Sequence, residues 1–312
     1  MKMITMAGVL SILFAVNLFG QSSVAITIDD VPNTVKFERD GFHSKLMDKL
    51  DSMDIPVAIF INEGLLFKTD SMVENFALLN EWAKRENVTL GNHTFNHSSY
   101  SEVGFDTFKL DVDKGAYLTQ ELSTKYQKEL KYFRFPYNNL GKDSLQHQEI
   151  KDYLIGQEYI ITPFTVESSD WMFSYIYEHY LKEGKKEEAK RVAETYIEKT
   201  LAYFDFYEAM VAEQYGRKIK HIYLCHDNSL NADYLEILIT KLKERDYNFI
   251  SLDEAMGDKV YQQKDLYTKQ WGVSWLYRWM SDNKERTKLM KQEPDMSAIQ
   301  EEYKKITSNT TP

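Results

Sequence analysis

The sequence predicts an α/β fold built around a parallel sheet or barrel. Short apolar runs alternate with helical patterns along most of the 312 residues, as in successive strand–helix–strand units. No low-complexity or Pro/Ser-rich linker divides the chain, so one domain with appendages is expected. Polar side chains follow several of the apolar runs, and the carboxyl ends of parallel strands share one face. These observations place a candidate site at that face.

The alternation runs from the amino-terminal part of the chain to about residue 255. The first strand candidate is VAITID (24–29), and a helical pattern with Leu46, Leu50 and Met53 follows it. The second candidate, VAIFIN (57–62), precedes a helical pattern in which Met72, Phe76, Leu79 and Ala83 recur at three- and four-residue spacing. The later strand candidates are VTLGNH (88–93), KYFRFPY (131–137), YIITPFTV (159–166), HIYLCHD (221–227) and NFISL (248–252).

Two regions depart from this rhythm. Residues 172–215 are predicted to form a helical insertion between two strands, and residues 256–312 a helical extension, so the main domain covers 21–255. In the extension, Trp271, Trp275 and Trp279 would share one helix face. We expect this stripe to pack against the main domain, with sugar stacking as the alternative.

The first 20 residues are predicted to be a signal peptide. Lys2 precedes a mainly apolar run of 13 residues (7–19), which is short for a bilayer span. A buried first helix is the alternative, but a strand pattern begins at once at Val24. We therefore expect an exported protein, periplasmic or secreted, without stable membrane insertion. The single Cys225 lies in an apolar run and is expected to be a core side chain.

The net charge of the chain is −10, from 48 acidic and 38 basic residues. Nucleic-acid binding needs a basic face, so nucleic acid is not the expected partner. The sequence leaves the oligomeric state open.

Five polar clusters follow five strand candidates. They are Asp29 with Asp30, His93 with His97, Arg134 with Tyr137, Glu167 with Asp170 and Trp171, and His226 with Asp227. Each cluster alone has an ordinary explanation, such as a turn former, an ion pair or a buried histidine. Together they supply complementary chemical roles, which favours one active site.

The two histidines of HTFNH and one carboxylate form a plausible metal-binding set. Imidazoles four residues apart can reach one ion, and a His₂–carboxylate set leaves a coordination position open for water. Zinc suits these ligands, and Co²⁺, Ni²⁺ and Mn²⁺ accept similar ones. If the strand turns at the adjacent Asp29 and Asp30, one carboxylate can bind the metal while the other takes a proton from water at the metal.

The remaining clusters complete a hydrolytic mechanism. His226 would be the general acid that protonates the leaving group. Arg134 and Asp170 would be supporting charges, with Arg134 orienting the base, and a backbone N–H near Tyr137 could stabilise an oxyanion. The predicted reaction is hydrolysis of an amide or ester.

These motifs resemble those of the polysaccharide deacetylases of carbohydrate esterase family four, the NodB homology domain. The likeness is carried by TIDDVP, HTFNH, RFPY, ESSDW and LCHD, which span residues 27–227 in the family's order. It implies a distorted (β/α) barrel, a divalent metal and removal of acetyl groups from an oligo- or polysaccharide. By position, Asp30, His93 and His97 resemble the metal ligands, Asp29 the base, and His226 the acid. Further, Arg134 and Asp170 resemble a pair that supports the base, and Trp171 resembles a wall of the acetyl pocket.

Three departures from the family pattern concern the shape of the groove. Val31 replaces a glycine, Glu167 replaces an aspartate, and Gly141 lies further from Tyr137 than usual. None removes a predicted metal ligand or proton carrier. Two alternatives remain at this point: a metal-dependent amidase acting on a small non-sugar amide, and a carbohydrate-binding protein without turnover.

Overall fold

The computed structural model describes residues 21–310, so the predicted signal peptide lies outside the described residues. Its centre is an eight-stranded sheet in the order β5-β4-β3-β2-β1-β7-β6, with β8 paired to β1. Every pairing between these strands is parallel, which confirms the predicted α/β fold with a distorted, partly open barrel. The strands are β1 (Ser22–Val31), β2 (Val57–Ile61), β3 (Val88–Asn92), β4 (Tyr132–Phe133), β5 (Ile160–Ile161), β6 (Val166–Glu167), β7 (Lys220–His226) and β8 (Tyr247–Phe249).

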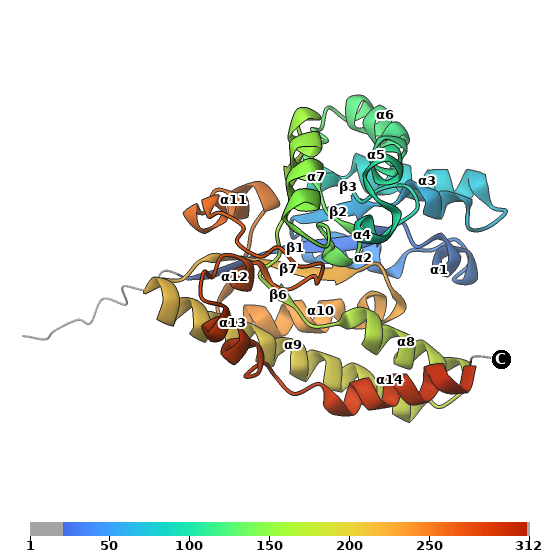
Figure 1. The fold of residues 1–312 in the computed structure, drawn as a ribbon. Helices are drawn as coiled ribbons and strands as arrows, with labels where there is room; N and C mark the ends of the chain where they lie inside the picture. Colours follow the sequence, from blue (N-terminus) through green and yellow to red (C-terminus); the bar gives the residue numbers. More distant parts are fainter. Residues whose placement is uncertain (1–20, 311–312) are drawn as a thin grey trace, which may run out of the picture.

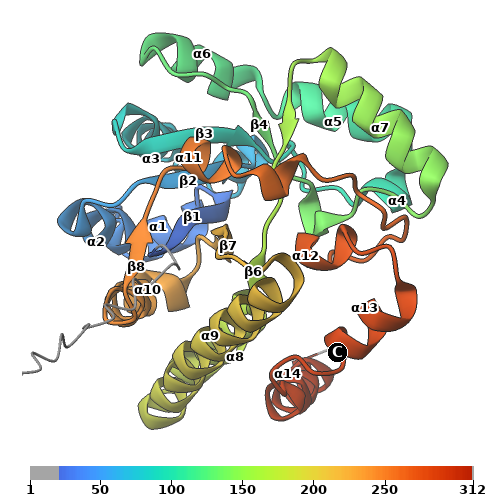
Figure 2. The same cartoon turned by 90° about the vertical axis from the view of Figure 1, so that its left-hand side faces the viewer.

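Helices surround the sheet on both sides (Figures 1 and 2). One group packs beside β2–β5: α3 (Met72–Lys84), α4 (Tyr100–Val103), α5 (Phe105–Lys114), α6 (Tyr117–Lys125) and α7 (Ser144–Gly156). The other lies on the β1, β7 and β6 side: α8 (Asp170–Lys182), α9 (Lys186–Tyr215), α10 (Ser229–Lys243), α12 (Trp275–Arg278), α13 (Asn283–Met290) and α14 (Ser297–Thr310). Short elements complete the fold: α1 (Thr34–Arg39), α2 (Lys45–Met53), η1 (Glu63–Phe67), η2 (Pro136–Asn138), α11 (Leu252–Met256) and η3 (Lys259–Gln262).

The interior of the barrel changes from apolar to polar along the strands. Side chains alternate between the two faces of a strand, and on β1 the interior series is Ala25, Thr27 and Asp29. Ala25 packs in one cluster with residues of β2, β7 and α11, so apolar side chains fill the barrel at that level. Asp29 and His226 extend the interior rows of β1 and β7 to the carboxyl end. Asp29 and His226 therefore lie directly above a layer of apolar side chains in the barrel interior.

The barrel is open between its two terminal strands, and the carboxyl-terminal extension fills the opening. Within the described residues β5 and β6 are not paired, although YIITPFTV had been predicted as one strand; Pro163, which lacks an N–H, lies between them. The Ser274 hydroxyl donates to the carbonyl of Thr165 at 2.8 Å, and the Trp275 N–H donates to the carbonyl of Phe164 at 3.0 Å. The Trp275 side chain packs against all three apolar clusters of the molecule.

The prediction that three tryptophans of the extension share one helix face is wrong for Trp271. Helix α12 begins only at Trp275, and Trp271 lies in the preceding non-helical segment. Trp275 and Trp279 pack together, with ring centroids 6.2 Å apart. The reason is local: Ser274 caps α12 by accepting from the Leu276 N–H, so the helix starts after it.

Helices α8 and α9 occupy the segment between β6 and β7 in which a helical insertion was predicted. The spaced residues of α9, among them Ala193, Ile197 and Phe204, are buried against the rest of the molecule. Helix α14 lies beside α8 (Figure 1). Among the described helices, none combines the length and the apolar character that crossing a membrane would require.

Candidate active site

Asp29 and Asp30 enter one site because β1 is distorted at its end. The pairing register between β1 and β2 shifts between Ile28 and Val31, and Asp30 has a positive φ of 60°. The expected turn is therefore a bulge, and the strand continues to Val31. Asp29 stays in the interior row with 2% exposure, whereas Asp30 is partly exposed.

Three side chains form a candidate metal centre. Asp30, His93 and His97 offer ligand atoms that all lie within 4.8 Å of one another. The Asp30 Oδ1 atom is 3.7 Å from His93 Nε2 and 3.3 Å from His97 Nε2. His93 follows β3 directly, and His97 reaches the same point because its own φ of 58° bends the loop back.

The donor set fits a divalent cation. The His93 Nδ1 atom lies 2.7 Å from the Arg134 carbonyl, so the N–H belongs there and Nε2 keeps a free lone pair toward Asp30. Burial lowers the pKa of His93 to about 3, which keeps the ring neutral, the form that binds metals. His97 and Asp30 are partly exposed, so the centre has an open side. This is the His₂–carboxylate arrangement with room for a further ligand.

Two glycines clamp the loop that carries His97. A Cβ atom added to Gly64 would lie 2.3 Å from the Phe95 carbonyl oxygen, and one added to Gly115 would lie 2.3 Å from the Thr94 carbonyl carbon. The Gly64 N–H also donates to the Phe95 carbonyl at 3.0 Å. Backbone from η1 and from the end of α5 thus meets the loop directly, because no side chain intervenes.

Asp29 is paired with a fully buried arginine. The Arg134 Nη1 group donates to Asp29 Oδ1 at 2.8 Å and to Thr27 Oγ1 at 2.7 Å, and the guanidinium lies 4.2 Å from the centre of the Phe60 ring. Burial raises the pKa of Asp29 above its ordinary value, and Arg134 opposes that effect. The carboxylate is therefore fixed in direction and made more basic than an exposed aspartate.

His226 is paired with Asp170, which corrects the expected role of that aspartate. The His226 Nδ1 atom lies 2.7 Å from Asp170 Oδ1, so Asp170 supports the histidine and not the base. The second oxygen, Oδ2, accepts from the His226 N–H at 2.9 Å, from Asn228 at 2.8 Å and from Asn231 at 2.6 Å. Burial alone would lower the pKa of His226, but Asp170, with Asp30 and Asp29, outweighs it and raises the value to about 10. The imidazole is thus held protonated.

The predicted substrate-binding residues lie at the rim. Tyr137 is 63% exposed, and its ring centroid is 4.6 Å from that of His97. Trp171 is half-exposed on α8 and packs edge-on against Tyr303 of α14. Its role as a wall of an acyl pocket stays a prediction. Glu167 accepts a hydrogen bond from the Ser169 N–H, and burial together with Asp170 raises its pKa to about 7.

Sequence reasoning missed the residues that hold the candidate catalytic groups in place. Thr27 accepts from Arg134, and Asn228 and Asn231 hold Asp170. The signals were present: Thr27 lies two positions before Asp29 on the same strand face, and the asparagines directly follow the last motif. Asn33 was also missed; its N–H donates to Asp227 Oδ2 at 2.9 Å and joins the loops after β1 and β7.

The backbone is unusual at these loops. Asp30, Thr94, His97, Tyr137, Asn138 and Ser169 all have positive φ. Each such non-glycine residue costs of order 1–3 kcal/mol, and such strain gathers at functional sites where the surrounding structure imposes it. Four of the five motif segments contain at least one of these residues.

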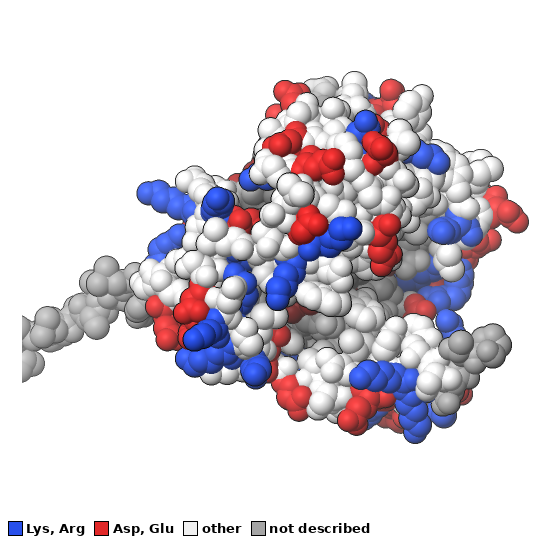
Figure 3. All heavy atoms as spheres, in the orientation of Figure 1, with Lys and Arg blue, Asp and Glu red and all other residues white. Residues whose placement is uncertain are grey.

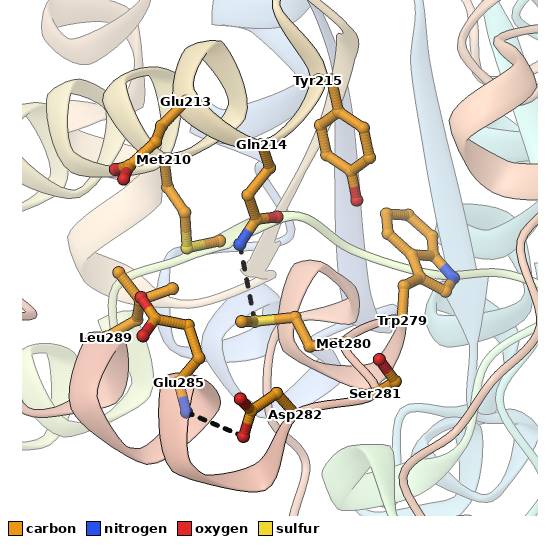
Figure 4. Close-up of a pocket in the computed structure, with 10 residues that line it drawn as sticks. All are labelled: Met210, Glu213, Gln214, Tyr215, Trp279, Met280, Ser281, Asp282, Glu285 and Leu289. Atoms are coloured by element: carbon orange, nitrogen blue, oxygen red, sulfur yellow. Dashed lines mark hydrogen bonds between the residues drawn. The ribbon is translucent and has the colours of Figure 1, made fainter.

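The surface around the site is mixed in charge and recessed. In Figure 3, acidic and basic side chains are interspersed, and the surface is hollowed between the part that carries α4 and the part that carries α8. The pocket of Figure 4 is a different one, lined by the end of α9, by residues 279–282 and by α13. Tyr215 in this pocket lies shortly before β7 begins, at the opposite end of the strands from the metal centre. None of the predicted site residues lines it.

Comparison with known proteins agrees with this geometry. The family model described as polysaccharide deacetylase matches residues 18–154, which include Asp29, Asp30, His93, His97 and Arg134. The protein YheN of Bacillus subtilis (strain 168), assigned to the polysaccharide deacetylases, is 24% identical over 237 residues, covering 76% of this chain and 69% of YheN.

A solved structure shares the fold. The peptidoglycan N-acetylglucosamine deacetylase Bc1960, solved in complex with a hydroxamate-type benzamide, matches with a TM-score of 0.50 at 20% identity, over 76% of this chain and 89% of that one. The family-four pseudoenzyme BA3943 of Bacillus anthracis matches with a TM-score of 0.49 at 16% identity, over 76% and 66% of the two chains. The polysaccharide deacetylase model thus matches the part of the chain that carries the candidate metal ligands and Asp29, and the fold is shared with Bc1960.

Proposed function

We propose that the protein is a metal-dependent hydrolase that removes N-acetyl groups from a carbohydrate outside the cytoplasm. One observation carries this proposal: Asp29 and His226 are direct partners on the paired strands β1 and β7, beside the Asp30–His93–His97 cluster. A base and an acid flanking one cation are what hydrolysis of an amide requires. The predicted signal peptide and the family supply the expected location and the class of substrate.

The residues divide the proton transfers between them. A divalent cation bound by Asp30, His93 and His97 would polarise the acyl oxygen and acidify a water molecule. Asp29 takes the proton of the attacking water, because burial has raised its pKa and Arg134 holds it in place. His226 gives a proton from Nε2 to the leaving nitrogen, since Nδ1 is engaged by Asp170. The amine departs neutral, and the acyl group leaves as acetic acid, which loses its proton to solvent. Passage of the proton on Asp29 to His226 through solvent restores the starting state.

The metal we propose is zinc, because two imidazoles and one carboxylate with an open position suit it. Co²⁺, Ni²⁺ and Mn²⁺ are the alternatives, and the ligand set alone does not choose between them.

The test combines metal content with acetate release from a panel of N- and O-acetylated oligosaccharides and small amides. Asp29→Asn should retain metal and lose turnover, whereas His93→Ala should lose both. Removal of the metal by a chelator should abolish acetate release by the parent protein, and added metal should restore acetate release. Equal metal content in the two variants would overturn the assignment of roles. Ammonia or acetate from small amides alone would favour an amidase, and metal binding without any product would favour a carbohydrate-binding protein.

A further inference from the structure

The segment that leads into α12 reaches the rim of the metal centre. Ser274 and Trp275 are fixed to the chain between β5 and β6 by the hydrogen bonds to Thr165 and Phe164. The residues just before them, Trp271 and Gly272, therefore lie where the open side of the barrel meets its carboxyl-terminal face. This segment belongs to the extension and lies outside residues 18–154, which the family model covers.

Gly272 locks this segment against the Tyr137 loop. A Cβ atom at Gly272 would lie 2.4 Å from the Tyr137 carbonyl oxygen and 2.8 Å from the Asn138 Cβ atom. Backbone therefore contacts backbone, and only glycine allows this approach without displacement. The Tyr137 ring in turn is 4.6 Å from the His97 ring, measured between centroids. Trp271 is one residue from this contact, so its backbone lies close to the Tyr137 loop, whose ring contacts His97.

The Trp271 indole faces solvent at this position. It is 64% exposed, compared with 46% for Trp171, 6% for Trp279 and 0% for Trp82. Tyr137, whose backbone meets Gly272, is 63% exposed. Large aromatic side chains usually bury most of their surface, because burial of their apolar faces is favourable. Two exposed aromatic side chains at the rim of a hydrolytic centre therefore point to a ligand that covers them.

We propose that Trp271 is a stacking platform for a sugar ring of the substrate, in a subsite next to the residue that is deacetylated. A pyranose presents an apolar face of C–H groups, which packs on an indole, while its hydroxyl groups remain in water. This inference rests on the proposed function and adds a specificity-determining residue to it. It implies a substrate of more than one sugar unit, because a single unit held at the metal leaves the platform uncovered.

The experiment compares Trp271→Ala with Trp271→Phe. An N-acetylated glucosamine tetramer and a small acetyl ester serve as substrates of the metal-loaded full chain, with Tyr117→Ala as the control, since Tyr117 is 73% exposed on α6. Trp271→Ala should raise KM for the tetramer roughly three- to tenfold, the size of one aromatic stacking contact. Turnover of the ester should not change, Trp271→Phe should restore most of the loss, and the control should behave as the parent.

Calorimetric titration of the tetramer into the Asp29→Asn protein, with and without Trp271→Ala, separates this proposal from the proposed function. Weaker binding in the double variant supports the platform even if the parent releases no acetate. Equal tetramer binding or equal KM in the presence and absence of the indole overturns the platform, while turnover by the parent would leave the deacetylase proposal standing. No tetramer binding by the Asp29→Asn protein overturns the platform, whereas acetate release from the panel decides the proposed function separately.

Discussion

Replacing Asp170 with asparagine tests the coupling between this carboxylate and His226. The difference between an ordinary histidine pKa of 6.5 and the value of about 10 corresponds to roughly 5 kcal/mol in favour of the imidazolium. Asp170 is the largest stabilising contributor. In the variant, the three donors that now bind Oδ2 will take the amide oxygen, so the NH₂ group will face His226 Nδ1. A donor facing a donor disfavours the protonated ring, and we expect the pKa of His226 to fall to about 7 or below.

This change has a distinct pH signature. The raised pKa keeps the acid protonated in the parent, and the associated stabilisation of the fold is complete below pH ~6.5 and is lost as the pH rises through about 10. With a pKa of about 7, only about a tenth of the acid remains protonated at pH 8 and about a hundredth at pH 9. The value of kcat/KM for an N-acetylated glycan should therefore fall about tenfold at pH 8 and about a hundredfold at pH 9, with a much smaller loss near pH 6.

The assay is the pH profile of kcat/KM, together with titration of the His226 ring signal by NMR in the metal-free protein. Asp233→Asn is the matched control, because Asp233 is another carboxylate on this side of the molecule but binds Lys45 and Tyr177. An unchanged His226 titration, or a loss of equal size at every pH, would refute the reasoning.

Two further perturbations address the metal loop and the base. Gly115→Ala should displace the Thr94 carbonyl and weaken metal affinity in a metal titration. Gly156→Ala is the control, because no atom lies within 4 Å of the added Cβ, and it should leave the metal affinity unchanged. Equal metal affinities of the two variants would show that the loop adapts. Arg134→Met leaves the buried Asp29 without its partner and should reduce the free energy of unfolding by about 3–5 kcal/mol at pH 7. Asp29 has a raised pKa and becomes protonated at low pH, so it then needs its partner less. The loss of unfolding free energy relative to the parent should therefore shrink as the pH is lowered toward 4, measured by urea unfolding. A loss that does not depend on pH would show that packing dominates.

The fold was predictable because apolar strands alternate with helical patterns along the chain. The composition of the candidate site was predictable because side chains alternate between the two faces of each strand. Apolar strands with period two carry Asp29 and His226 on their inner faces, and parallel pairing brings their ends together. The two histidines could be assigned to one cation because spacing and residue type suffice for that.

What could not be predicted depends on hydrogen bonds between distant segments. The motif order suggested that Asp170 supports the base, but its geometry is set by Asn228 and Asn231, far along the chain. The position of the segment that carries Trp271 likewise depends on the bond from the Ser274 hydroxyl to the carbonyl of Thr165, which lies 109 positions earlier in the chain. Periodicity describes neighbours along a chain, and these contacts join residues more than 50 positions apart.

The seam between β5 and β6 also constrains the order of assembly. During synthesis the candidate metal ligands and proton carriers emerge before Ser274 and Trp275, and the gap between β5 and β6 is filled only when those two residues arrive. A nascent chain that ends just after His226 thus contains the candidate metal ligands and proton carriers but lacks the segment that closes the barrel. The gap between β5 and β6 is therefore filled only after Trp275 has been synthesised.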